Sequence, residues 1–291
     1  MSPCTPSGHS MLGTTLDYWL LRALAHDRNK ATEAELDARG DSAITAEQLT
    51  TKLPKIIGRF EGHFPLEPGL RYLDMGCGSG EFTVELAKRG VRRITGVDFL
   101  PRFVETARAN ARSAGVDDRV SIVCHDLRTW QPEEKFDVLL SFDSFEHIDT
   151  PRPFMARMAD FLAPGGRAVL AFGPMFQSPF GDHMYEFFRV QVPWRGVLFS
   201  EDAMLRVRRE FYRPTDPATR YQEISGGLNL MRYSEFLDHA RETGWVFDYL
   251  RTNAFLPPGA LRRVSNAVTS LPGLQDYFVH NVYAVMRRAE G

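Results

Sequence analysis

The amino-acid sequence predicts an α/β fold with a doubly wound, mostly parallel sheet, N-terminal helices and one inserted segment rich in aromatic residues. Two observations carry this prediction. A buried strand at residues 71–74 runs straight into a turn containing Gly76, Gly78 and Gly80, and strand-like and helix-like patterns then alternate along the chain. Alternating strands and helices with right-handed crossovers build a parallel sheet with helices on both faces. A chain of 291 residues is long enough for one such domain with insertions.

The individual elements follow from the spacing of apolar residues, which is helical in some segments and forms short strand-like runs in others. Glycines end two of the helices, at Gly115 and Gly244, and Pro164-Gly165-Gly166 precedes the fifth strand. In chain order, the expected elements are helices 16–25 and 46–60, strand 71–74, helix 81–89, strand 93–97, helix 102–114, strands 120–124 and 136–141, helix 153–162, strand 167–172, helix 234–243, and strands 246–250 and 281–286.

Residues 176–232 interrupt this alternation and are rich in aromatic side chains. We expect them to form a lid that binds substrate, with most of the rings buried and with Phe176, Tyr185 and Trp194 as candidates for ligand contact. The sequence thus predicts a loose N-terminus over 1–13, a core over 14–175 and 233–291 that includes the N-terminal helices, and an inserted lid over 176–232.

Composition and charge restrict the class of protein. Hydrophobic residues make up 43% of the chain and charged residues 25%, and the formal net charge is −2, with both signs mixed, which argues against a nucleic-acid partner. No apolar run could cross a membrane, and residues 1–13 lack the features of a signal peptide, so we expect a cytoplasmic protein without membrane contact. The three cysteines, Cys4, Cys77 and Cys124, are expected to be reduced thiols.

An aspartate ends each of three successive strands: Asp74, Asp98 and Asp126. The glycine turn has the spacing G-x-G-x-G and is followed by Glu81, which departs from the G-x-G-x-x-G of dinucleotide-binding proteins. Acids on both sides of the turn disfavour a pyrophosphate and favour a ligand with an ammonium group. Asp98 can accept hydrogen bonds from ribose hydroxyls, and Asp126 from an adenine amine. Taken singly, each aspartate could instead cap the following helix or turn.

Apolar side chains next to these acids can cover an adenine ring, and Leu127 and Phe99 are the candidates. Together, the glycine turn and the ordered acids resemble the class I S-adenosylmethionine-dependent methyltransferases. The resemblance covers residues 71–172 well and extends more loosely towards the C-terminus. Within that family, the strand at 136–141 and the residues after it are most similar to the enzymes that act on small molecules.

The resemblance implies a Rossmann-like fold, S-adenosyl-L-methionine as the cofactor and S-adenosyl-L-homocysteine as the product. It also implies that the glycine turn holds the methionine part of the cofactor, the second-strand acid the ribose and the third-strand acid the adenine. The expected cofactor-binding residues are Asp74, Gly76, Cys77, Gly78, Gly80, Asp98, Phe99, Asp126, Leu127 and Phe142.

Methyl transfer is an in-line displacement, to which alignment of the reactants alone can contribute about 7 to 11 kcal/mol. An alcohol or phenol acceptor also needs a base, whereas a neutral amine does not. His183, early in the insertion, is the preferred candidate, followed by His147 after the fourth strand and by Tyr185. Alternatively, His183 is a loop residue or packs against Trp194, and His147 has a structural role.

Asp143, Glu146 and His147 have a D-x-x-E-H spacing that resembles the E-x-x-E-H metal site of the ubiquinone-biosynthesis O-methyltransferases. Aspartate replaces the first glutamate of that motif. Oxygen and imidazole ligands could hold magnesium or a transition ion, but acids at such a position more often cap a helix or meet solvent. We therefore assign no metal ligands.

These observations predict an S-adenosylmethionine-dependent methyltransferase that methylates an oxygen of a ring-containing or apolar small molecule. N- or C-methylation of a small molecule is the first alternative. A nucleic-acid or protein methyltransferase is the second, although Ser141-Phe142-Asp143-Ser144 stands where amino-methylating enzymes carry [DNS]-P-P-[YF]. The third is a protein that binds the cofactor without transferring its methyl group. The acceptor and the oligomeric state are not assigned.

Overall fold

The computed structural model describes residues 11–25, 46–184, 188–224, 226–254, 269, 271 and 273–289. These residues form a seven-stranded sheet with the order β3-β2-β1-β4-β5-β7-β6. The strands from β3 to β5 pair in parallel, whereas β7 is antiparallel to both of its neighbours. The predicted α/β class and mostly parallel sheet are confirmed. No helix within the described ranges is long and apolar enough to cross a membrane.

The strands are β1 (Arg71–Met75), β2 (Arg93–Asp98), β3 (Val120–Cys124), β4 (Phe136–Phe142), β5 (Leu162–Phe172), β6 (Trp245–Ala254) and β7 (Val279–Arg288). The helices next to the sheet are α3 (Ala46–Gly58), α4 (Glu81–Lys88), α5 (Pro101–Ser113), α6 (Pro151–Phe161) and α9 (Tyr233–Glu242). The remaining helices are α1 (Met11–Leu24), α7 (Arg195–Leu198), α8 (Glu201–Phe211) and α11 (Gln275–Phe278), with short 3-10 turns η1 (Phe145–His147) and η3 (Tyr221–Glu223).

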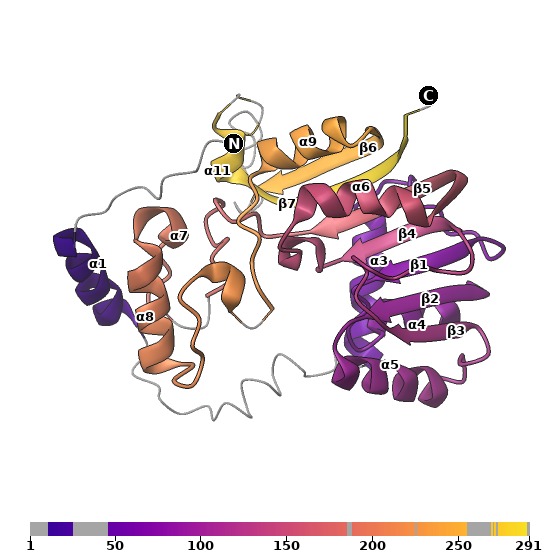
Figure 1. Cartoon of the computed structure of the whole chain (residues 1–291), viewed down its shortest axis with the longest axis horizontal. Helices are drawn as coiled ribbons and strands as arrows, with labels where there is room; N and C mark the ends of the chain where they lie inside the picture. Colours follow the sequence, from indigo (N-terminus) through magenta and orange to yellow (C-terminus); the bar gives the residue numbers. More distant parts are fainter. Residues whose placement is uncertain are drawn as a thin grey trace.

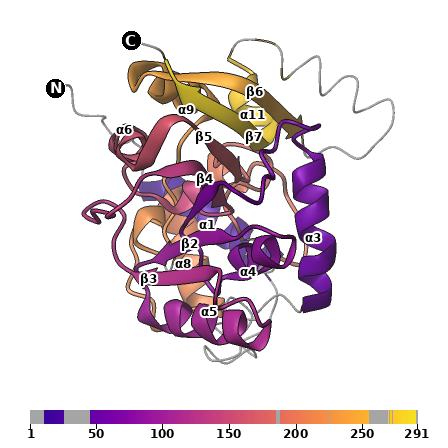
Figure 2. The same cartoon turned by 90° about the vertical axis from the view of Figure 1, so that its right-hand side faces the viewer.

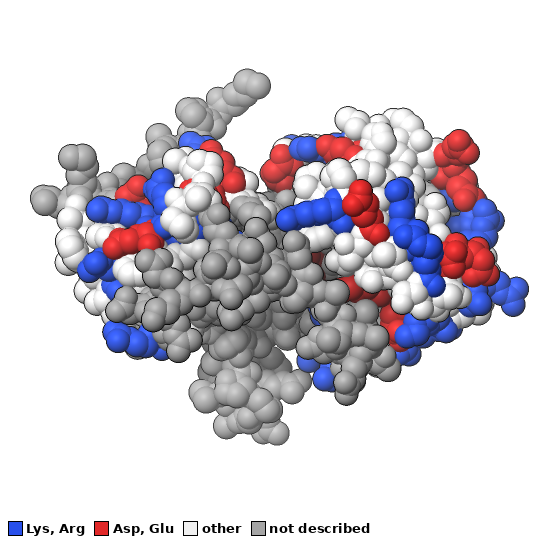
Figure 3. All heavy atoms as spheres, turned by 90° about the horizontal axis from the view of Figure 1, so that it is seen from below, with Lys and Arg blue, Asp and Glu red and all other residues white. Residues whose placement is uncertain are grey.

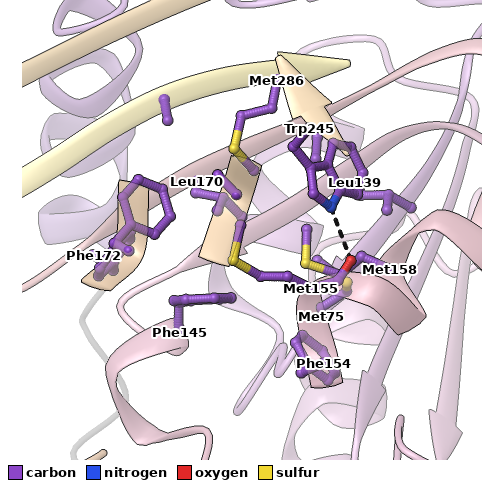
Figure 4. Close-up of a cluster of buried hydrophobic side chains, with 14 of the residues drawn as sticks. Met75, Leu139, Phe145, Phe154, Met155, Met158, Leu170, Phe172, Trp245 and Met286 are labelled. Carbon is purple, nitrogen blue, oxygen red and sulfur yellow. Dashed lines mark hydrogen bonds between the residues drawn. The ribbon is translucent and has the colours of Figure 1, made fainter. Parts of the chain in front are cut away.

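Helices cover both faces of the sheet, and each face has its own apolar core (Figure 2). One core joins α6 and α9 to the strands, and Figure 4 shows its centre, where the indole Nε1 of Trp245 donates a hydrogen bond to the backbone oxygen of Met155 at 2.9 Å. The other core joins α3, α4 and α5 to the opposite face. Burial on both faces explains why the central strand β4 and the end of β5 are mostly apolar.

The fifth strand begins earlier than the sequence pattern predicts. β5 starts at Leu162, directly after α6, because Leu162 pairs with Phe136 before the chain turns through Gly165 and resumes pairing at Arg167. The register shifts at this point, because the short step from Phe136 to Val138 on β4 lies opposite the longer step from Leu162 to Arg167 on β5. The Pro-Gly-Gly sequence therefore lies inside an irregular strand instead of in front of it.

The inserted segment and the N-terminal helix share a third apolar cluster beside the sheet, where α1 lies along α8 (Figure 1). Tyr18 and Leu21 of α1 are buried in it together with Met204 and Val207 of α8. The side chain of Asp17 also accepts a hydrogen bond from the backbone nitrogen of Ser200, at 2.9 Å. The sequence analysis assigns α1 to the core. The division into core and lid stays a prediction. We call α1 and residues 176–232 together the helical lobe.

Candidate functional site

The glycine turn connects β1 to α4 and lies against two other elements. Its three glycines have positive φ angles, which side chains other than glycine adopt at a cost. A Cβ on Gly80 would lie 2.8 Å from the Cβ of Ala107 in α5, so the two helices approach each other closely at this point. A Cβ on Gly78 would meet no atom within 4 Å. The turn is therefore tightly packed at Gly80 and open at Gly78.

Gly80→Ala should lower the free energy of unfolding by about 2 to 4 kcal/mol, because alanine both strains a left-handed backbone and overpacks the contact with Ala107. Gly115→Ala is the matched control, since Gly115 also has a positive φ, of 64°, but a Cβ there would meet no atom within 4 Å. Urea denaturation measures both changes. Equal losses in the two variants would mean that the contact between α4 and α5 is not tight.

Asp98 ends β2 and fixes the shape of the turn. Its side chain is buried, and its Oδ2 accepts a hydrogen bond from the backbone nitrogen of Gly78 at 3.0 Å. Its Oδ1 accepts from the backbone nitrogen of Leu100 at 2.9 Å. A carboxylate can accept about four hydrogen bonds, so each oxygen keeps capacity for a ligand hydroxyl. Next to it, the side chain of Phe99 is 67% exposed and can contact a flat ligand.

Asp74 is buried at the end of β1. Its Oδ2 accepts a hydrogen bond from the Thr83 hydroxyl of α4 at 2.6 Å. Burial raises the pKa of Asp74 to about 6, and the negative charge of Asp98 adds to this rise. Asp74 is thus ionised at neutral pH. By contrast, the predicted residue Cys77 directs its thiol into a small apolar cluster with Val104 and Ala107, and burial raises the pKa of the thiol well above its usual value.

Asp126 follows β3 and is held by Arg128, a residue that the sequence interpretation missed. The guanidinium of Arg128 contacts both carboxylate oxygens, at 3.0 Å from Nε to Oδ1 and 2.7 Å from Nη2 to Oδ2, and lowers the pKa of Asp126. Arg128 also pairs with Asp149 at 3.1 Å. The carboxylate is therefore oriented by Arg128. Leu127 packs its side chain against the large apolar core.

The chain after β4 lies directly against the glycine turn. The hydroxyl of Ser144 is 3.0 Å from the backbone oxygen of Gly76, to which it can donate. The ring of Phe142 packs on Phe82, with ring centroids 5.0 Å apart, inside the core under α3 and α4. Ser144 thus connects β4 to the turn, and the side chain of Phe142 serves the core.

The three residues of the D-x-x-E-H motif do not converge on a common point. Asp143 forms an ion pair with Lys52 of α3 at 2.8 Å, Glu146 is buried, and His147 is exposed. Among the described residues, no group of three or more histidine, cysteine, aspartate or glutamate side chains is arranged to hold a metal ion. The three side chains therefore do not fit the metal site that their spacing resembles. This corrects the possibility, raised from the sequence, that they hold a metal ion.

Two of the predicted bases, His147 and His183, lie together at the seam between the core and the helical lobe. Their ring centroids are 5.8 Å apart in an edge-to-face arrangement. Nδ1 of His147 is 2.7 Å from the backbone oxygen of Gly227, and Nε2 of His183 is 3.4 Å from that of Pro174. Burial and the neighbouring His147 lower the pKa of His183 to about 4. The third candidate, Tyr185, lies outside the described residues.

A third histidine of this seam was not predicted from the sequence. His280 lies in β7, and its Nδ1 is 3.0 Å from the hydroxyl of Ser178. Burial and the nearby His183 lower its pKa to about 4. Its position could not be foreseen, because β7 joins the sheet beside β5 through pairing with residues more than a hundred positions earlier.

The lid candidates have different surroundings. Phe176 lines a hollow beside Glu146 and packs edge-to-face on Tyr221, with ring centroids 5.0 Å apart. Trp194 contacts Phe278 and donates from Nε1 to the backbone oxygen of Tyr277 at 2.7 Å. Of the three rings chosen from the sequence, Phe176 lines the hollow, whereas Trp194 holds the lobe against α11.

Comparison with known proteins gives consistent matches. Residues 73–166 match the protein family described as a methyltransferase domain. The chain is 30% identical over 237 residues to trans-aconitate 2-methyltransferase of Streptomyces coelicolor, a match that covers 77% of the chain and 71% of that relative. It is 34% identical over 142 residues to 27-O-demethylrifamycin SV methyltransferase of Amycolatopsis mediterranei, which covers 48% of the chain and 51% of that relative, about half its length.

Among solved structures, the chain is similar to geranyl diphosphate methyltransferase in complex with its cofactor. The TM-score is 0.52 with 19% sequence identity, over 84% of the chain and 90% of that structure. At this level of identity the likeness concerns the fold. It agrees with the seven-stranded, mostly parallel sheet of the described residues.

Proposed function

Since the chain belongs to the class I S-adenosylmethionine-dependent methyltransferases of small molecules, we propose that it methylates an oxygen of a ring-containing or apolar acceptor. The contact that supports an oxygen acceptor is the one between His147 and the backbone oxygen of Gly227. It joins the core to the lobe and orients an imidazole at the seam between them. The related enzyme that methylates an oxygen of demethylrifamycin agrees with this choice.

The residues around the glycine turn fit the cofactor. The open space above Gly78 allows a ligand to approach the backbone, and Asp98 keeps acceptor capacity next to it. We assign the ribose hydroxyls to Asp98, the methionine part to the turn with Asp74, and the adenine to the region of Phe99, Asp126 and Leu127. S-adenosylmethionine, when bound, supplies a methyl group on a positively charged sulfur.

We assign the proton transfer to His147. A carbonyl oxygen only accepts hydrogen bonds, so Nδ1 of His147 carries the hydrogen that is donated to Gly227, and in the neutral ring the lone pair is on Nε2. That lone pair can accept the proton of an alcohol or phenol. His183 is neutral at pH 7 because its pKa is about 4, and its ring packs edge-to-face against the imidazole of His147.

His147→Ala should reduce turnover of a hydroxyl acceptor about 100-fold, which is the smaller end of the usual contribution of a histidine base. Binding of S-adenosylhomocysteine, measured by calorimetry, should change less than about twofold, because the cofactor residues lie on other elements. His183→Ala is the comparison, and we expect a smaller loss from it. If His183→Ala abolishes turnover and His147→Ala does not, the two roles are exchanged.

The function itself is tested by incubating the full chain with S-adenosylmethionine and a panel of phenols, alcohols and amines, and by measuring S-adenosylhomocysteine and the mass of each product. Turnover with hydroxyl compounds supports the proposal, and turnover with amines alone would replace it by N-methylation. Cofactor binding without turnover on any acceptor would favour a non-catalytic binding protein. Neither histidine variant is needed for this result.

The charge distribution supports a small-molecule acceptor over a nucleic acid. On the face shown in Figure 3, Lys and Arg alternate with Asp and Glu over the described residues. Elsewhere among the described residues, charges are paired directly, as in Arg93 with Glu134 at 2.9 Å and Arg71 with Asp137 at 2.8 Å. A mixed surface of this kind gives little attraction for a phosphate backbone.

A further inference from the structure

Glu146 is buried at the seam between the core and the helical lobe, and one of its carboxyl oxygens has no hydrogen-bond partner among the described residues. It lies in η1, just after β4, and is 6% exposed. Its Oε1 accepts a weak hydrogen bond from the backbone nitrogen of Gly173 at 3.4 Å. Its Oε2 is the unpartnered atom. Leaving a buried polar group unpaired costs about 1 to 3 kcal/mol. Packing alone therefore does not explain a glutamate at this position.

The carboxyl group lines a hollow between the core and the lobe. The space measures about 230 Å³ including its opening to solvent. Its enclosed part has room for about one water molecule, so a ring-containing molecule has to push the lobe outward to enter. The lining is otherwise apolar, from Phe172, Pro174, Met175, Phe176, Gly181, Leu228, Leu230 and Met231, with Asn229 as the other polar residue.

Both polar atoms of the Asn229 side chain already have partners in their own chain. Its Nδ2 donates to the backbone oxygen of Phe145 at 2.8 Å, and its Oδ1 accepts from the backbone nitrogen of Met231 at 3.1 Å. Its backbone nitrogen donates to the backbone oxygen of Glu146 at 2.9 Å. Among the described residues, Glu146 Oε2 is therefore the one side-chain oxygen or nitrogen of the lining that has no hydrogen-bond partner.

The charged groups near Glu146 favour its neutral form. Burial raises the pKa of Glu146 to about 8, and Asp143 raises it further than Lys52 lowers it. On the lobe and on β7, His183 and His280 have pKa values of about 4 and bring no positive charge at neutral pH. Because Oε1 accepts from Gly173, the proton of the neutral carboxyl belongs on Oε2. Glu146 thus presents an O–H donor to an apolar hollow.

We propose that Glu146 recognises the methyl acceptor in this hollow by donating a hydrogen bond from Oε2 to a carbonyl or ether oxygen of an otherwise apolar molecule. The proposal rests on the proposed function, which it extends by naming the chemical class of the acceptor. It gives Glu146 a role in binding, and leaves the proton transfer to His147. An ionised Glu146 would instead accept a hydrogen bond, either as a base or from a bound amine.

The test compares binding of acetophenone with binding of ethylbenzene, a hydrocarbon of nearly the same shape, to the full chain saturated with S-adenosylhomocysteine. Ligand-observed NMR measures both affinities at pH 7. We expect a preference for the ketone of about five- to tenfold in the wild type, corresponding to one neutral hydrogen bond. Glu146→Gln keeps an N–H donor at this position and should retain the preference, and Glu146→Leu should lose it. Asp118→Asn, which removes an exposed acid outside the lining of the hollow, is the control and should retain it.

The pH dependence separates a donor from a base. In the wild type the ketone preference should disappear as pH rises through about 8, where the carboxyl group ionises, and Glu146→Gln should keep it throughout. Infrared spectroscopy gives a readout that needs no variant, because the carbonyl stretch of the protonated carboxyl should shift when acetophenone binds. Equal affinity of the wild type for the two probes, or a preference that grows above pH 8 and is absent from Glu146→Gln, would overturn the proposal. Either result would leave the turnover measurements, and so the proposed function, untouched.

Discussion

Asp98→Ala is expected to weaken binding of S-adenosylmethionine and S-adenosylhomocysteine about 100-fold or more. The Asp98 carboxylate is the group that we assign to the ribose hydroxyls, and hydrogen bonds to a charged group contribute about 1.5 to 3 kcal/mol each. Two such bonds account for at least about 3 kcal/mol, or roughly 100-fold. The substitution also leaves the backbone nitrogens of Gly78 and Leu100 without their acceptor, which loosens the turn.

Calorimetry with S-adenosylhomocysteine measures the loss. Asp98→Asn keeps one acceptor oxygen for the turn and should be intermediate, so it separates the loss of the ribose contact from the loss of turn geometry. Asp118→Ala removes an exposed acid near the end of α5 and should bind the cofactor as the wild type does. Undiminished binding by a folded Asp98→Ala variant would place the cofactor away from the end of β2.

The cofactor side of the site follows from local sequence patterns. Asp74 and Asp98 stand in or at the end of apolar runs, and such runs bounded by glycine are readable as strands. Parallel strands place their carboxyl ends at one edge of the sheet, so the order of the acids along the chain already brings them together. The glycine turn is readable for the same reason, since its backbone conformation is a property of neighbouring residues.

The acceptor side of the site depends on contacts between distant segments. Gly227 orients His147, and Gly173 contacts Glu146, but neither partner is signalled by the residues next to the histidine or the glutamate. The motif of Asp143, Glu146 and His147 resembled a metal site because spacing alone says nothing of burial. In the folded chain Asp143 forms an ion pair with Lys52, and Glu146 lines the hollow.

The helical lobe shows a similar limit. The sequence predicts an insertion over residues 176–232, but it does not predict that α1 packs on this segment through contacts between residues far apart in the chain. Its amphipathic pattern predicts a helix with one buried face and does not say which partner covers it. Arg128 is a different case, because it stands two residues after Asp126, and an arginine so close to an acid is a signal that the sequence contains.

The lobe is organised around a fully buried ion pair. Arg195 and Asp182 have side chains that are 0% and 1% exposed, and Nη2 lies 3.0 Å from Oδ1. The guanidinium also donates to the side-chain oxygen of Gln191 at 2.9 Å and lies over the ring of Phe188 at 4.3 Å from its centroid. His183 directly follows Asp182, and Trp194 directly precedes Arg195. Both have positive φ angles. Backbone conformations of this kind persist only where the surroundings hold them, and the backbone nitrogens of both residues donate hydrogen bonds, His183 to the oxygen of Phe180 and Trp194 to that of Pro179.

Arg195→Met should therefore lower the free energy of unfolding by about 3 to 5 kcal/mol, because it leaves the carboxylate of Asp182 buried without its counter-charge. Urea denaturation measures the change. The double variant Asp182→Asn/Arg195→Met should recover most of it, since asparagine removes the charge and can still accept from the backbone nitrogen of Met184. Arg241→Met breaks an exposed pair with Asp238 and should cost no more than about 0.5 kcal/mol. A single variant as stable as this control would show that the lobe holds its shape by apolar packing alone.

If the lobe instead unfolds separately, Arg195→Met should keep cofactor binding and lose acceptor turnover, because the glycine turn lies in the core and the acceptor hollow is closed by the lobe.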